Sequence, residues 1–296
     1  MTRSSRLTNA PHPDYLAAVQ RHPSACQRLE VMSKKLPITL ETTPAETTAD
    51  HLVRVIQRNE PNLDSSDFDK AEISFPAPEH VKHITGVEIP IPTVTFPHAS
   101  DYNSFTRKAG YFTPPQGLSL GIEGGSFCSA LGISTTEALK EFSLRIVVYC
   151  QEQLSAAMPP AQTWQHEAVH CLDPLIDLRS GENYLIAEII ARIGEFAQPG
   201  TPDRSEVRTS SNVWLSHLMS HLMGGGRISL AFTSTFKLPL TLNPLSAAKK
   251  MPGLISYFTK RHSNTKLVRL MMGCYSFAEL FPRLQDLEPN YYKPPG

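Results

Sequence analysis

The residues best suited to chemistry are His166, Glu167 and His170, which form the pattern H-E-x-x-H. Positions i and i+4 share one face of a helix, so two imidazoles with this spacing can hold one cation. Zinc suits such a pair because it accepts neutral imidazole nitrogens in a tetrahedral shell, and a third protein ligand would leave one position for water. Glu167 would then serve as the general base for that water. The alternative is an ordinary helix with two surface or core histidines.

The flanking sequence predicts a helix around this pattern. Pro159 and Pro160 can occupy the first turn of a helix, where a missing N–H costs nothing. No helix-breaking residue occurs from 162 to 172, and Asp173-Pro174 ends the run. We therefore expect both imidazoles on one helical face.

A second helix is expected from Glu182 to Phe196, with Glu188 among apolar residues on every side. A helix that is apolar all round is buried, and an unpaired ionised carboxylate there costs several kcal/mol. A bound cation explains Glu188 economically, because one loop could return this helix antiparallel to His170. The alternatives are a partly exposed position or an ion pair with Arg192. Glu182 is the other candidate ligand, but an acid in a first turn already interacts favourably with the helix dipole.

His217 and His221 form a second H-x-x-x-H pair on an expected helix that ends at Gly224. Three interpretations remain open for this pair. The two residues could bind a second metal, or one could donate a hydrogen bond to a tetrahedral intermediate at the first site. Both could also be ordinary residues beside a core stripe that contains Trp214.

His80 and His83 also lie close together, beside Glu79. The β-rich composition of this region predicts that they lie on a short strand with a lysine between them. Paired histidines in such a setting are usually solvated, so we do not assign them to a metal site.

The rest of the chain predicts a mixture of helices and short strands. The hydrophobic pattern predicts helices over 14–36, interrupted at Pro23, and over 47–58, 245–258 and 265–280. Strands are expected at 72–75, 80–84, 93–96 and 228–242, with a hairpin over 109–122. The segment 87–91, with Pro90 and Pro92 alternating with isoleucines, is expected to be an edge strand or an extended loop. The stretch 134–158 has a helical stripe and a helix-capping pattern, although its Ile146-Val147-Val148 run favours a strand.

Composition restricts the class of protein. The 296 residues carry 28 basic and 28 acidic side chains, so no net field favours nucleic acid or an anionic membrane. The basic C-terminal third lacks a nucleic-acid motif and is interpreted as a solvated face. No apolar run approaches the ~18 residues of a membrane span, and the five scattered cysteines fit reduced thiols. We expect a cytoplasmic protein without a nucleic-acid or membrane partner; residues 1–13 are either a targeting leader or a short disordered tail.

The segment His166-Glu-Ala-Val-His170, followed by Glu188-Ile-Ile-Ala191, resembles the gluzincin branch of the zinc metallopeptidases. In that family the glutamate of the second helix completes the metal site. The resemblance implies that His166, His170 and Glu188 are zinc ligands and that Glu167 is the general base. It also implies that the 109–122 segment supplies an edge strand for an extended substrate. The acid that often follows the third ligand by four residues is replaced here by Arg192.

The expected fold is therefore α+β and zincin-like, with a small mixed sheet, an H-E-x-x-H helix, a following glutamate helix and a helical C-terminal part. We expect an N-terminal tail and helical segment over 1–45, a metal-binding core over 46–205 and a mainly helical subdomain over 206–296. The expected function is a zinc-dependent metallopeptidase that acts on a peptide or protein substrate. The rivals are a non-catalytic scaffold with a zincin-like core and a di-iron protein, because Glu167 and His170 also have E-x-x-H spacing.

Overall fold

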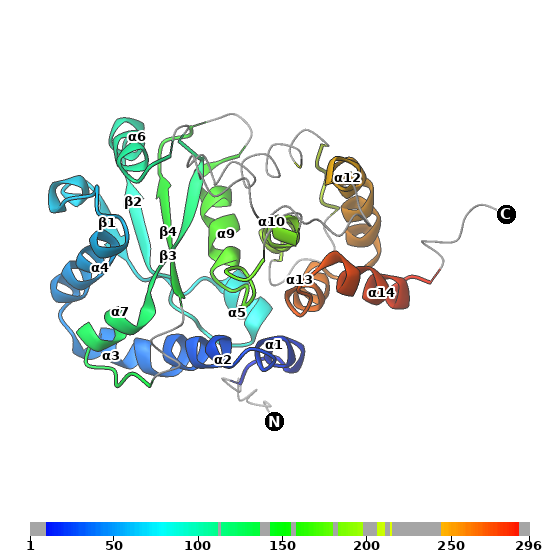
Figure 1. Cartoon of the computed structure of the whole chain (residues 1–296), viewed down its shortest axis with the longest axis horizontal. Helices are drawn as coiled ribbons and strands as arrows, with labels where there is room; N and C mark the ends of the chain where they lie inside the picture. The colour runs from blue at the N-terminus through cyan, green and yellow to red at the C-terminus, as the bar shows by residue number, and fades with distance from the viewer. Residues whose placement is uncertain are drawn as a thin grey trace, which may run out of the picture.

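A computed structural model describes most of the chain (Figure 1). The described residues are 10–111, 114–136, 143–154, 158–179, 183–197, 206–210, 214 and 244–289, with the backbone alone for 244–250. Within them the protein is a mixed α+β structure with one small sheet and many helices.

The sheet has four strands, β1 (Glu72–Ser74), β2 (Thr93–Phe96), β3 (Gly117–Glu123) and β4 (Ser143–Cys150), in the order β1-β2-β4-β3. The β2–β4 pair is parallel, and the other two pairs are antiparallel. β4 is an inner strand, and its β-branched run Ile146-Val147-Val148 is completely buried, as expected for a strand that is covered on both faces. Within the described chain β3 is an edge of this sheet.

Helices cover the sheet and extend beyond it (Figure 1). α9 packs against β3 and β4 on one side, and α10 packs against α9. Figure 1 shows α4 on the other side of the sheet. The helices are α1 (Pro13–Val19), α2 (Pro23–Glu30), α3 (Leu36–Thr42), α4 (Ala45–Asn59), α5 (Glu79–Thr85), α6 (Ala99–Lys108), α7 (Gly124–Ala130), α9 (Pro160–His170), α10 (Tyr184–Gly194), α12 (Pro244–Arg261), α13 (Asn264–Met272) and α14 (Phe277–Leu287). A π-helical turn, η1 (Val31–Lys35), joins α2 to α3, and a 3₁₀ turn, η2 (Ser65–Phe68), precedes β1.

Several expected elements are confirmed. The N-terminal helical segment divides before Pro23, which takes the first position of α2. The helix expected over 47–58 is α4, and strands occur near 72–75 and at 93–96. The helices around the H-E-x-x-H pattern and around Glu188 are α9 and α10.

Two predictions of secondary structure are wrong. The stretch 134–158 is not one long helix, because residues 143–150 form β4; here the β-branched run outweighs the helical stripe. The 80–84 segment is not a strand but lies within helix α5, which ends at Gly86 with a positive φ of 84°. Residues 87–91, which carry Pro90, do not pair as a strand, in agreement with the extended-loop alternative.

The hairpin predicted over 109–122 is also wrong. Ala109 caps the end of α6 and Gly110 turns the chain with a φ of 90°, so no strand enters there among the described residues of this segment. β3 pairs with β4, which follows α7 in the sequence. The helix expected over 265–280 is two helices, α13 and α14. The strand expected over 228–242 lies outside the described residues.

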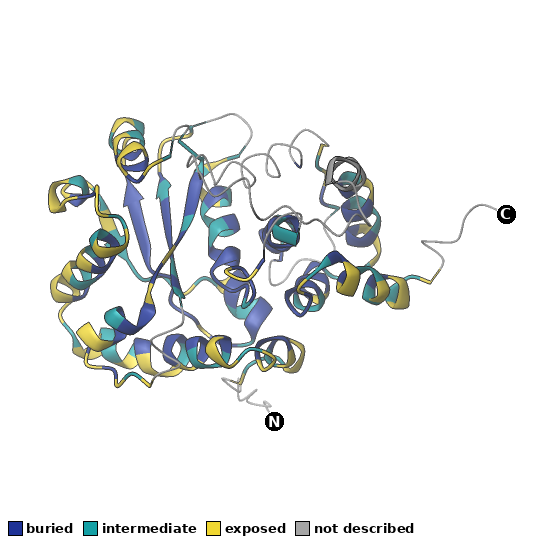
Figure 2. Ribbon diagram, viewed as in Figure 1, coloured by how far each residue is buried: buried dark blue, intermediate teal, exposed yellow. Residues whose placement is uncertain are grey.

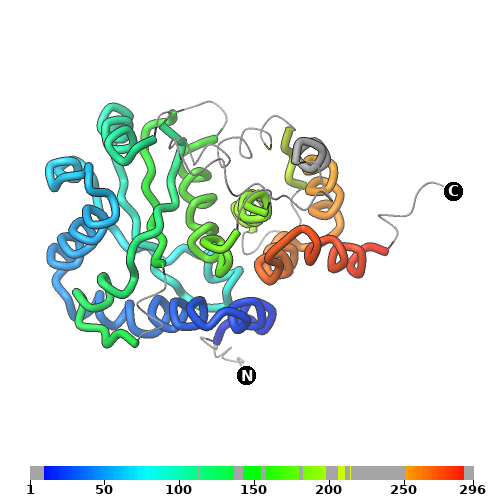
Figure 3. Tube along the Cα trace, viewed as in Figure 1, coloured from blue at the N-terminus to red at the C-terminus, as the bar shows by residue number. Residues whose placement is uncertain are grey.

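One hydrophobic core connects the two ends of the described chain. It runs from Tyr15 in α1 through the sheet to Leu284 in α14, and Figure 2 shows the buried residues concentrated on the strands, α9 and α10. α13 packs on both α10 and α1, so the blue and orange ends of the tube lie side by side in Figure 3. The three-part division of the chain stays a prediction. Among the described residues, no helix combines the length and the apolar character of a membrane span.

Candidate metal centre

α9 carries His166 and His170 on the face that is turned toward α10. The helix begins with Pro160 at its first position and continues for three turns without a breaking residue. The two imidazole rings lie with their centroids 4.9 Å apart and their planes at 81°. Both side chains are buried, so the i, i+4 spacing has placed two metal-ligating groups side by side in the protein interior.

Glu188 on α10 faces both histidines. One of its carboxylate oxygens lies 3.4 Å from His166 Nε2 and the other lies 3.6 Å from His170 Nε2. One donor atom from each of the three residues can be chosen so that all lie within 4.8 Å of one another, and all three residues are buried. Two imidazoles and one carboxylate are a ligand set that zinc uses in catalytic sites.

Close packing of α9 on α10 brings these groups together. A Cβ atom at Gly194 would lie 2.8 Å from both γ-carbons of Val169, so only glycine fits at this crossing without a shift. The buried face of α10 is otherwise aliphatic, which leaves Glu188 as the polar group that the helix presents to α9 there. The helix–helix contact thus places a carboxylate opposite two imidazoles.

The electrostatics of the site call for a cation. Burial by itself would lower the pKa of His166, but contacts with Glu188 and Glu195 raise it to about 10. The pKa of Glu167 is raised to about 7, chiefly by burial. Glu188 and Glu195 also raise this pKa, whereas His166 and Arg145 lower it. The carboxylates of Glu188 and Glu195 therefore favour a positive charge beside His166. One divalent ion together with the Arg192 guanidinium would neutralise the three carboxylates.

Glu167 lies at the border between α9 and the sheet edge. A Cβ atom at Gly117, the first residue of β3, would lie 2.9 Å from Glu167 Cγ and 3.3 Å from its Oε1. Glu167 also keeps partial exposure, in contrast to its buried neighbours His166 and His170. Glu167 therefore lies nearer the surface than His166 and His170, beside the beginning of β3.

Arg145 fastens the same edge strand. Its Nη1 donates a hydrogen bond of 2.8 Å to the carbonyl oxygen of Ser119, and its Nη2 pairs with Asp177. The N–H of Val147, the residue opposite Ser119, bonds to Pro92 on the other side of β4. In an antiparallel ladder, hydrogen-bonded and non-hydrogen-bonded residue pairs alternate, and Ser119–Val147 is a non-hydrogen-bonded pair. The N–H and C=O groups of Ser119, and of Gly117 two residues earlier, therefore point away from β4. Arg145 takes the outward carbonyl of Ser119, and Gly117 stands at the start of the strand beside Glu167.

A buried ion pair holds the C-terminal end of α9. Arg179 donates two hydrogen bonds to Asp173, of 2.9 and 3.1 Å, and both side chains are completely buried. The same guanidinium bonds to the carbonyl of Cys274, and Tyr15 donates to the carbonyl of Leu172. These contacts fix the position of α9 relative to α1 and the turn before α14.

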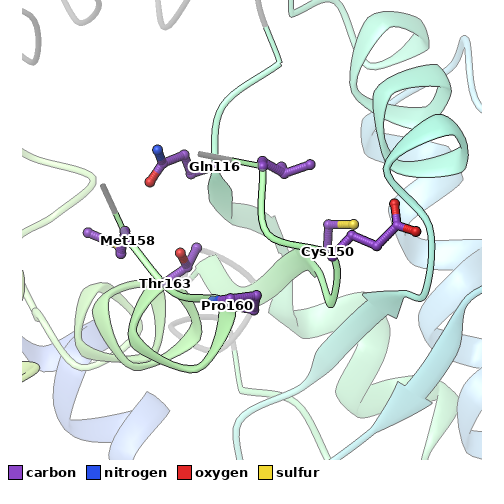
Figure 4. Close-up of a pocket in the computed structure, with 7 residues that line it drawn as sticks. Gln116, Cys150, Met158, Pro160 and Thr163 are labelled. Carbon is purple, nitrogen blue, oxygen red and sulfur yellow. The ribbon is translucent and has the colours of Figure 1, made fainter. Parts of the chain in front are cut away.

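A shallow surface depression, with no enclosed space for even a water molecule, lies at the N-terminal end of α9 (Figure 4). Gln116, Cys150, Met158 and Thr163 line it. Thr163 also contacts the position of Gly117, next to Glu167. The depression therefore adjoins the stretch of edge strand that faces the carboxylate.

Sequence reasoning missed three groups around the centre. The Glu195 side chain is fully buried, with Oε2 lying 3.7 Å from His166 Nδ1 and Oε1 lying 2.8 Å from Arg192 Nη1. Arg192 thus pairs with Glu195, whereas the sequence suggested Glu188 as its alternative partner. The second group is Tyr184, whose pKa is raised by burial and by the nearby carboxylates of Glu188 and Glu167. The third is Arg145, which binds the carbonyl oxygen of Ser119 on β3. The i, i+7 spacing of Glu188 and Glu195, two turns of one helix face, was the available signal.

Other predicted site residues do not enter this geometry. Glu182, His217 and His221 lie outside the described residues. His80 is buried on α5 against the Trp164 ring, so the exposed strand position predicted for it is wrong. The His166–His170–Glu188 group is the one cluster of this kind within the described residues.

Comparisons of the chain with protein-family models, with curated proteins and with solved structures found no match.

Proposed function

We propose that the protein is a zinc-dependent metallopeptidase with a zincin-like fold. The observation that carries the proposal is the buried group of His166, His170 and Glu188, whose donor atoms gather within 4.8 Å. A group of two imidazoles and a carboxylate, with excess negative charge around it, fits zinc by ligand type and by charge. When bound, zinc supplies a Lewis acid that polarises a carbonyl and activates water.

Glu167 is the general base of the proposed reaction. It adjoins the metal ligand His166 in the sequence, keeps partial exposure, and has a pKa raised to about 7. A base whose pKa is near the working pH can accept a proton from water and return it to a leaving amine. Among the described carboxylates beside His166, Glu167 is the one that is partly exposed, because Glu188 and Glu195 are buried.

β3 is the proposed docking edge for an extended peptide. It is an edge of the described sheet, and Gly117 turns its backbone N–H and C=O outward beside Glu167. A peptide could add to this edge by main-chain hydrogen bonds, as extended ligands do on exposed strands. Arg145 already occupies the next outward carbonyl, at Ser119. A peptide could therefore pair with only a short stretch of β3, around Gly117.

The decisive experiment compares wild type with Glu167→Gln in zinc content and in hydrolysis of an unstructured protein such as casein. We expect both proteins to hold one zinc and the variant to lose at least about 100-fold of the activity, as expected when a general base is removed. A zinc-loaded wild type without hydrolysis of casein or of a mixed peptide library would contradict the peptidase assignment and favour the non-catalytic scaffold.

A further inference from the structure

The geometry points to Glu195 as the positioning residue of the metal centre: we propose that its carboxylate accepts the Nδ1 proton of His166 and so presents Nε2 to the ion. This inference deepens the proposed function and rests on it. The observations that carry it are the direction of the imidazole ring, the placement of the carboxylate and the clamp that holds that carboxylate.

The direction of the His166 ring is fixed by its neighbours on α10. Nε2 faces Glu188 at 3.4 Å, so Nε2 is the nitrogen available to an ion shared with Glu188 and His170. Nδ1 then points to the far side of the ring, where Glu195 Oε2 lies 3.7 Å away. A metal-bound imidazole donates its second N–H to an acceptor, and a carboxylate is the commonest strong one. A shift of under about 1 Å brings this pair to the usual length of a charge-assisted hydrogen bond.

The Glu195 carboxylate is buried and held in place. Its side chain is completely inaccessible, and Arg192 Nη1 contacts its Oε1 at 2.8 Å. The guanidinium offsets the cost of burying the charge and leaves Oε2 directed at the imidazole. Arg192 thus holds Glu195, and Glu195 in turn orients the ring of His166.

Glu195 is not an additional ligand in this arrangement. It lies on the Nδ1 side of His166, whereas the donor atoms of the cluster lie on the Nε2 side, and it is absent from the group that can surround one ion. Its effect on the metal is therefore indirect: it selects the tautomer with the proton on Nδ1 and increases the basicity of Nε2. Arg192, four residues after Glu188, stands where the gluzincins that this segment resembles often have an acid, and Glu195 stands three residues further on.

The test is the zinc dissociation constant of the full chain, measured by competition with a chromophoric chelator. We expect Glu195→Gln to weaken zinc binding by about 10- to 100-fold, because the amide keeps the shape but loses the charge. Glu195→Asp should fall between wild type and Glu195→Gln, and Glu152→Gln, a surface acid beside His98, is the matched control with unchanged affinity. Circular dichroism identifies folded variants, and the Asp variant covers the case in which the Gln variant does not fold.

A second readout separates positioning from general destabilisation. With cobalt in place of zinc, the visible absorption bands of the ion should shift in folded Glu195→Gln and stay unchanged in Glu152→Gln. Zinc affinity within about twofold of wild type in folded Glu195→Gln and Glu195→Asp, below the usual effect of such partners, would overturn the inference while the metal centre stands. A wild type that binds no zinc would overturn the proposed function and this inference together.

Discussion

His80 and His166 are buried to the same degree, with 5% and 6% of each residue exposed, yet their chemistry diverges. Burial lowers the pKa of His80 to about 4, with only a backbone hydrogen bond to Gln165 opposing. The pKa of His166 is raised to about 10, because Glu188 and Glu195 outweigh the same effect of burial. α5, which carries His80, packs against α9, which carries His166, so one part of the fold holds a neutral packing histidine and another whose neighbouring acids favour a positive charge.

The comparison teaches that burial alone does not identify a functional histidine. The His80 ring packs edge-on against Trp164, with the ring centroids 5.9 Å apart, and behaves as an aromatic core residue. The His166 ring meets carboxylates at both nitrogens. Several buried acids around one imidazole lower the stability of the protein unless a cation neutralises them. Such a cluster of acids therefore indicates a cation-binding site.

The largest expected difference is in metal affinity. His166→Ala should weaken zinc binding by more than the ~100-fold that loss of an outer partner costs, because a ligand itself is removed. His80→Phe, an equally buried change beside the same helix, should leave the affinity unchanged. Competition titration with a zinc chelator measures both. Equal losses in the two variants would show that the effect comes from disturbing α9 and not from ligation.

The next largest effect is the response of His80 to acid. Its folded-state pKa lies below the unfolded value of 6.5, so its contribution to stability is complete above pH 6.5 and is lost as the pH falls toward 4. The loss amounts to about 3 kcal/mol. Urea unfolding of metal-free protein across this range should show a smaller acid loss in His80→Phe than in wild type. Parallel curves for the two proteins would contradict a neutral, buried His80.

Removal of the metal should destabilise the protein by a similar amount. At free zinc of 100 times the dissociation constant, ligand binding stabilises the folded state by about 2.7 kcal/mol. Chelation should therefore lower the unfolding temperature of wild type and of His80→Phe alike. In His166→Ala, chelation should change the unfolding temperature little. A decrease as large as that of wild type would show that the stabilising metal binds elsewhere in the chain.

The smallest effect is expected at His98, which has an acid but no burial. His98 Nδ1 lies 3.1 Å from Glu152, and both side chains are largely exposed, at 67% and 50%. Solvent screens such a pair, so His98→Ala should change neither zinc affinity nor the unfolding midpoint measurably. A clear loss of zinc in His98→Ala would break the rule that a functional imidazole here needs both burial and acids.

Local signals were enough to predict the two helices that carry the centre. Pro160 marks the start of α9, and the aliphatic surroundings of Glu188 marked both a buried helix and an unusual acid. His166, His170 and Glu188, the three predicted ligands, are the residues that the structure brings together. Their function as zinc ligands stays a prediction.

Non-local contacts explain what the sequence did not predict. β3 has the alternation of a hairpin strand, but its partner β4 begins 20 residues after β3 ends, and no pattern within 109–122 reveals that pairing. The sequence of β4 is compatible with a helix or a strand, and its position inside the sheet decides for the strand. Glu195 closes α10, where an acid beside Arg192 resembles a surface ion pair. Only the packing of α9 on α10 shows that the Glu195 carboxylate is buried beside His166, with Arg192 paired to it.

The most direct test of the metal centre is elemental analysis with X-ray absorption on protein purified without added metal. The proposed site predicts one zinc per chain, with two imidazole nitrogens and carboxylate oxygen at roughly 2.0–2.2 Å, and loss of that zinc in Glu188→Ala. A metal-free wild type that also fails to bind added zinc, or a zinc whose shell is unaffected by Glu188→Ala, would contradict it.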